Sequence, residues 1–154
     1  MTYNKILVPF DGSTPSKNAL KEAVELAKQS KGTIFLLYVV HEIALPPHFD
    51  YGPKLGHIKT SKEYLKEVYH EVNERANKLL EENKKKYENY GIGIETQTLY
   101  GNTVEKILSF IKSNRIDIVV IGTTSRTGIS KLIALGSVAR KVTEQSTRPV
   151  LLVH

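Results

Sequence analysis

The segment from residue 122 to residue 138, GTTSRTGISKLIALGSV, is well suited to bind an anion. Its glycines would let a ligand approach the backbone closely, and its hydroxyl groups and two cations, Arg126 and Lys131, could hydrogen-bond to phosphate oxygens. Gly136, Ser137 and Val138 directly precede the helical pattern ARKVTEQST, and backbone N–H groups at the start of a helix bind anions. The segment therefore predicts a phosphate-binding loop, with a simple long connection as the alternative.

Asp11 is a second candidate for contact with a ligand. It follows the apolar run KILVPF at residues 5–10 and precedes Gly12 and Ser13. Aspartate followed by glycine and serine is also common in turns that lead into a helix. Asp11 is thus a candidate either for a binding carboxylate or for a turn residue.

Several other kinds of site are excluded by spacing. The stretch PFDGSTPS has one glycine, which is too few for a dinucleotide fingerprint, and the chain has no G-x-x-x-x-G-K-[ST] motif. A phospho-receiver domain needs an aspartate at the end of the third strand, where this chain has Tyr100 and Gly101. The five histidines form no i, i+4 pair, so we predict no metal site. No triad or acid pair indicates a catalytic site, and we predict no catalytic residues.

Composition indicates one compact domain, residues 1–154, without disulfides, because the chain has 154 residues and no cysteine. No apolar run is long enough for a membrane span, and the start of the chain does not resemble a signal peptide, so we expect a cytoplasmic protein without membrane contact. The net charge is +6, but the lysines are interleaved with glutamates along helices. This dispersal argues against nucleic acid as a partner.

Five apolar runs alternate with helical patterns and predict the elements that position these residues. Such alternation favours an open parallel sheet with helices on both faces, whose ligands bind at the carboxyl ends of the strands where the strand order reverses. With the run at 5–10 central, that point lies between Asp11 and Gly122. The five predicted strands cover residues 5–10, 33–40, 92–100, 116–122 and 148–154.

The predicted helices carry recognisable end signals. Ser13 or Thr14 is expected to cap the first helix, and Gly32 has the position of a glycine that ends it. Thr60 is expected to cap a long helix that ends near Gly91. Asn102 and Glu105 predict the start of a third helix. Residues 41–59, rich in proline and glycine, are expected to form a loop.

Three stretches together resemble the universal stress protein family: KILVPFDGSTPSKNAL, TIFLLYVV and the long C-terminal stretch that begins IDIVVIGTTSRTG. The resemblance implies a five-stranded α/β fold with strand order 3-2-1-4-5, and frequent dimerisation. It also implies ATP, with or without Mg²⁺, as the ligand of one class of members. The base would be held by Asp11 and the backbone of Val39. The ribose and phosphates would be held by Gly122, Gly136, Ser137 and Val138.

The chain departs from the family's ATP-binding pattern, which reads G-x-x-G, nine residues, then G-[ST]. Ser125 replaces the second glycine, and ten residues separate it from Gly136. A serine in a left-handed conformation and a lost phosphate hydrogen bond would together weaken binding by about two to three orders of magnitude. Arg126 and neighbouring hydroxyl groups could offset part of that loss.

Two functions follow as alternatives. The first is a stress-response regulatory module that binds ATP or a related adenine nucleotide, with at most slow, switch-like hydrolysis. The second is a nucleotide-free dimeric scaffold that acts through protein partners. Under either alternative we predict a homodimer, because the apolar strand at residues 149–153 would otherwise leave an exposed sheet edge.

Overall fold

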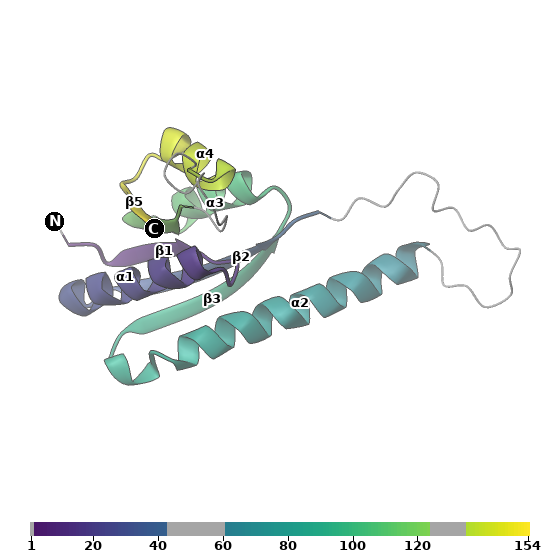
Figure 1. The fold of residues 1–154 in the computed structure, drawn as a ribbon, viewed down its shortest axis with the longest axis horizontal. Coiled ribbons are helices and arrows are strands. Elements are labelled where there is room, and N and C mark those ends of the chain that lie inside the picture. The colour runs from purple at the N-terminus through teal and green to yellow at the C-terminus, as the bar shows by residue number, and fades with distance from the viewer. Residues whose placement is uncertain (1, 43–60, 124–134) are drawn as a thin grey trace, which may run out of the picture.

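The computed structural model describes residues 2–42, 61–123 and 135–154. It contains one five-stranded, fully parallel sheet with the order β3-β2-β1-β4-β5, as predicted (Figure 1). The described elements are, in chain order, β1 (Lys5–Pro9), α1 (Thr14–Ser30), β2 (Thr33–Val40), α2 (Ser61–Lys85), the short 3-10 helix η1 (Glu88–Tyr90), β3 (Gly93–Tyr100), α3 (Thr103–Ser113), β4 (Ile118–Gly122), α4 (Ser137–Gln145) and β5 (Val150–Val153).

The two faces of the sheet carry separate hydrophobic cores. Helices α1 and α2 cover one face, and α3 and α4 cover the other (Figure 1). Alternate residues of β1 serve the two cores: Ile6 and Val8 pack against α1, whereas Leu7 packs on the side of α3 and α4. A strand buried on both faces needs an uninterrupted apolar run, which explains the sequence of residues 6–8.

Two helices begin where the sequence predicts. The Ser13 hydroxyl accepts a hydrogen bond from the Ser16 N–H at the start of α1, and the Asn102 side chain accepts one from the Glu105 N–H at the start of α3. Both side chains satisfy N–H groups that have no partner within the helix. The expected cap Thr60 lies outside the described residues. Helix α2 ends at Lys85, earlier than expected, and η1 then leads to Gly91.

Helix α1 ends just before Gly32, as predicted. Lys31, not Gly32, adopts the left-handed conformation, with φ of 54°. Gly32 is needed for another reason, because a Cβ atom there would lie 2.7 Å from the carbonyl oxygen of Tyr3. The glycine is therefore required because the backbone of Tyr3, just before β1, lies close to residue 32. It is not required for a left-handed turn.

The central position of β1 determines where a site can form. Strand β1 pairs with β2 on one side and with β4 on the other, so the strand order reverses at β1. The carboxyl ends of β1 and β4 therefore diverge into connections on opposite faces of the sheet. In the described part of the chain, no helix is long and apolar enough to cross a membrane.

Candidate functional site

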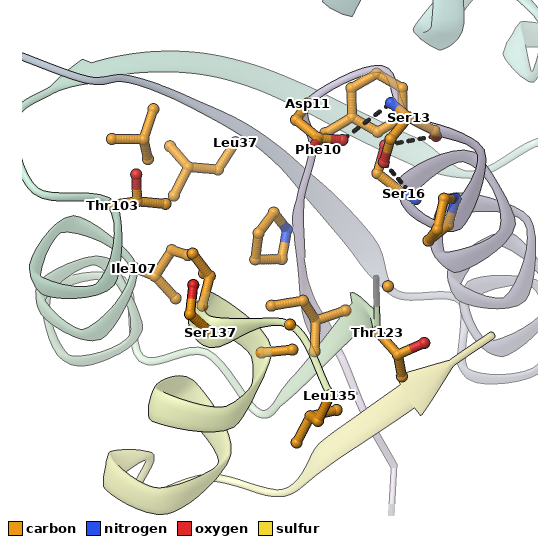
Figure 2. Close-up of a pocket in the computed structure, with 18 residues that line it drawn as sticks. Phe10, Asp11, Ser13, Ser16, Leu37, Thr103, Ile107, Thr123, Leu135 and Ser137 are labelled. Atoms are coloured by element: carbon orange, nitrogen blue, oxygen red, sulfur yellow. Dashed lines mark hydrogen bonds between the residues drawn. The ribbon is translucent and has the colours of Figure 1, made fainter. Parts of the chain in front are cut away.

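A pocket of about 540 Å³ lies at the carboxyl ends of β1 and β4 (Figure 2). Its volume is in the range typical of small-molecule sites. Six of the eight predicted binding residues line it; the other two, Ser125 and Arg126, lie outside the described residues. The six are Asp11, Val39, Gly122, Gly136, Ser137 and Val138.

One wall of the pocket is apolar. Leu37 and Val39 come from β2, and Ile107 faces them from α3 (Figure 2). Leu37 and Ile107 are almost completely buried. Packing in the hydrophobic core therefore fixes the positions of these two side chains in the wall. Thr103, the first residue of α3, adds a hydroxyl group to the lining. A flat, largely apolar ring would fit such a surface.

Asp11 lies at the rim of the pocket with its carboxylate already engaged. Its Oδ1 accepts a hydrogen bond of 2.9 Å from the Ser13 N–H (Figure 2). Partial burial by itself would raise the pKa of Asp11, but the hydrogen bonds from the Ser13 and Ser16 groups outweigh it, so the pKa is lowered. The carboxylate is therefore charged at neutral pH and can accept a hydrogen bond from a ligand.

The Asp11 turn depends on the glycine that follows. Gly12 has φ of +80°, a conformation that other residues rarely adopt. A Cβ atom at this position would also lie 2.8 Å from the Leu79 side chain of α2. The turn and binding interpretations of Asp11 are thus compatible, because the turn fixes the carboxylate at the pocket.

The start of α4 provides the pocket's anion-binding groups. Its cap residue is Gly136, which has no side chain to accept hydrogen bonds from the first N–H groups. At the starts of α1 and α3, by contrast, Ser13 and Asn102 fill this role. Ser137, Val138 and Ala139 line the pocket with these N–H groups at the positive end of the helix dipole. An anion in the pocket would take the place of the missing cap.

Gly122 has a packing role that the sequence did not indicate. A Cβ atom at this position would lie 2.5 Å from the carbonyl carbon of Pro15 and 2.7 Å from its oxygen. The first turn of α1 therefore rests directly on the end of β4. Because residue 122 has no side chain, α1 and β4 can approach each other this closely beside the pocket.

Comparison with known proteins identifies the family. The pattern of the universal stress protein family matches residues 2–154. The chain belongs to the universal stress protein family. Among its relatives, Universal stress protein MJ0531 of Methanocaldococcus jannaschii is 34% identical, over 98% of this chain and 82% of that protein. Universal stress protein YxiE of Bacillus subtilis is 32% identical, over 99% of both chains.

Solved structures of universal stress proteins share the fold. The protein UspA from Lactobacillus plantarum superposes with a TM-score of 0.82 at 23% identity, covering 100% of this chain and 99% of that one. An Arabidopsis thaliana family member with AMP bound has a TM-score of 0.64 at 20% identity, over 97% and 90% of the two chains. The Archaeoglobus fulgidus protein in complex with dAMP has a TM-score of 0.61 at 21% identity, over all of both chains.

Several residues that line the pocket of this universal stress protein were not among the predicted binding residues. Thr103 and Ile107 belong to a helix whose start was predicted, but no spacing in the sequence connects that helix to the phosphate loop. Thr123 follows Gly122 directly, and its hydroxyl is one of the loop hydroxyl groups that could have bonded to phosphate. The structure instead places that hydroxyl 3.1 Å from Nδ1 of His154.

Proposed function

We propose that this universal stress protein is a stress-response regulatory module that binds ATP or a related adenine nucleotide in the pocket between β1 and β4. The observation that carries the proposal is the uncapped start of α4, which opens on the same pocket as an apolar wall and an ionised carboxylate. A nucleotide has the matching groups: phosphates, an aromatic base and hydrogen-bond donors. The complexes of two relatives with AMP and dAMP support adenine as the base.

In this proposal the phosphates lie at Gly136, Ser137 and Val138. The N–H groups at the beginning of α4 would hydrogen-bond to phosphate oxygens, and the helix dipole would favour their negative charge. The hydroxyl of Ser137, which is exposed at this point, could add one more donor. Gly122, Ser125 and Arg126 would complete this end of the site.

The base would occupy the other end, between Val39, Leu37 and Ile107. Asp11 and the backbone of Val39 are the polar groups we assign to it. The carboxylate of Asp11 can accept a hydrogen bond from an amino group such as that of adenine, whereas a carbonyl oxygen at the same place would be repelled. This difference would favour adenine over guanine.

Mg²⁺ would reach this site with the nucleotide. Among the described residues, no group of three or more histidine, cysteine, aspartate or glutamate side chains could hold a metal ion. Oxygens of the phosphates, and water, are the ligands that Mg²⁺ ordinarily keeps when a protein binds it with a nucleotide. We therefore expect Mg²⁺ to change affinity for ATP more than affinity for AMP.

A homodimer through β5 is part of the proposal. Strand β5 lies at one edge of the sheet and pairs with β4 alone among the described strands. Leu151, in the middle of this apolar strand, is 38% exposed. Pairing of two copies would cover this edge. The scaffold function, without nucleotide, would use the same dimer, so nucleotide binding is the property that separates the two alternatives.

The proposal is tested by calorimetric titration of ATP into two variants of one residue. Ser137→Pro removes the N–H at the first position of α4, and proline is tolerated there because Gly136 has an extended ψ of 149°. Ser137→Ala removes the hydroxyl and keeps the N–H. We expect the proline variant to lose about tenfold in affinity and the alanine variant to lose much less. Equal affinity of both variants and the natural protein, or no binding of ATP at millimolar concentration, would reject the proposal.

A third variant tests the altered loop. Ser125→Gly combined with deletion of one of residues 126–135 restores the spacing of the family's ATP-binding pattern. We expect this variant to bind ATP more tightly than the natural chain. AMP, titrated in parallel, has one phosphate and should gain less.

A further inference from the structure

We infer that His154 is a positioning residue for the start of α4, which it holds in place through Thr123. His154 follows β5 directly, and Thr123 follows β4. The Thr123 hydroxyl and Nδ1 of His154 are 3.1 Å apart, within hydrogen-bond distance. The inference extends the proposed function, since it concerns the helix start to which we assign the phosphates.

Thr123 connects three parts of the site. Its N–H donates to the Val153 carbonyl at 2.9 Å, and its own carbonyl accepts from the Gly136 N–H at 2.6 Å. Both backbone groups of Thr123 are therefore used, one toward β5 and one toward the cap of α4. The residue is 4% exposed, so its hydroxyl also needs a partner, and His154 provides it.

His154 is itself held from α1. The Asn18 side-chain amide donates a hydrogen bond of 3.0 Å to the His154 carbonyl oxygen. Ser13, the cap of α1, and Ser16 in its first turn hold the Asp11 carboxylate. A chain of hydrogen bonds thus runs from α1 through His154 and Thr123 to Gly136, and it joins the two sides of the pocket.

This arrangement gives the Thr123 hydroxyl a positioning role. The hydrogen bond to His154 fixes the rotation of the Thr123 side chain and supports its backbone at the point where Gly136 is bound. Loss of that bond would allow the start of α4 to move relative to β4. Displaced N–H groups would then fit phosphate oxygens less well.

The experiment compares His154→Ala with His154→Asn, since the asparagine amide can place a donor or acceptor near the position of Nδ1. Two quantities are measured: ATP affinity by calorimetry, and hydrogen exchange of the Gly136 amide by NMR. We expect His154→Ala to weaken ATP binding about two- to tenfold and to accelerate Gly136 exchange by a similar factor, with both restored in His154→Asn. His70→Ala, a change at an exposed histidine of α2 outside the pocket lining, is the control.

Thr123→Val removes the same hydrogen bond from the other side. It should match His154→Ala, and the double variant should lose no more than either single variant. Unchanged Gly136 exchange in His154→Ala, or an asparagine variant as impaired as the alanine variant, would overturn the inference. If the natural protein binds no ATP, the proposed function fails, but the exchange measurement still decides whether His154 positions α4.

Discussion

Gly122 and Pro15 lie so close that a single Cβ atom at residue 122 would come within 2.5 Å of the Pro15 carbonyl carbon. The neighbour is backbone in the first turn of α1, which cannot rotate away as the end of a flexible side chain can. The contact joins β4 to α1 beneath the pocket, so the same glycine serves packing and the proposed ligand.

Gly122→Ala is therefore expected to destabilise the protein by about 1–3 kcal/mol, as overpacked sites do. The loss should be present without any nucleotide, and urea unfolding of the natural protein and the variant measures it. Gly91→Ala is an informative comparison, because no atom lies within 4 Å of a Cβ at that position, although its φ of 68° adds strain. A variant at 122 as stable as the natural protein would contradict the observed packing.

Gly136→Asp is expected to change stability and binding in opposite directions. The backbone at residue 136, with φ of −55° and ψ of 149°, already has the geometry of a helix cap. An aspartate there would accept hydrogen bonds from the first N–H groups of α4 and raise stability by roughly 0.5 kcal/mol. The same carboxylate would occupy the anion site and repel phosphate.

Affinity for ATP should therefore fall more than tenfold in Gly136→Asp. Gly136→Ala is the matched control, since it adds a side chain without a hydrogen-bond acceptor. If the aspartate variant binds ATP as well as the alanine variant does, the phosphates do not lie at the start of α4.

Asp11 should contribute to stability in a way that depends on pH. Its folded pKa is lowered by the hydrogen bonds it accepts, so its contribution is complete above the unfolded pKa of ~4 and is lost as pH falls through the lower folded pKa. Asp11→Asn removes this titration. The difference in melting temperature between the natural protein and the variant should be constant near neutral pH and shrink below about pH 4. A difference that stays constant to lower pH would refute the assignment.

Leu151→Lys tests the proposed dimer. Sedimentation equilibrium should show a dimer for the natural chain at micromolar concentration and a monomer for the variant, because lysine on an edge strand opposes pairing with another copy. Circular dichroism should be unchanged, since Leu151 is already partly exposed. Tyr90→Lys, at a residue that is 47% exposed on another part of the molecule, controls for the added charge. If the natural chain is a monomer at micromolar concentration, the proposed dimer is ruled out.

The sequence predicted the features that depend on local chemistry. Apolar runs located all five strands, and the side chains of Ser13 and Asn102 located two helix starts, because capping needs only the next few residues. The strand order followed from the family resemblance, and with it the convergence of Asp11 and Gly136 on one pocket.

Features that depend on contacts distant in sequence could not be predicted. Gly32 was predicted only as the glycine that ends α1, whereas the close approach that requires a glycine there comes from Tyr3, distant along the chain. The partners Thr123 and His154 are 31 residues apart, and neither residue type signals the other. Lys31 adopts the left-handed conformation although its side chain gives no indication of it.

The hydrogen bond between the Gly136 N–H and the Thr123 carbonyl has a consequence for variation in this family. It ties together Thr123 and Gly136, the two residues on either side of residues 124–135. Lengthening a closed loop of this size by one residue costs only ~0.1 kcal/mol of chain entropy. A change of one residue in the length of this connection should therefore cost the fold little, because the register between β4 and β5 is set by their own pairing.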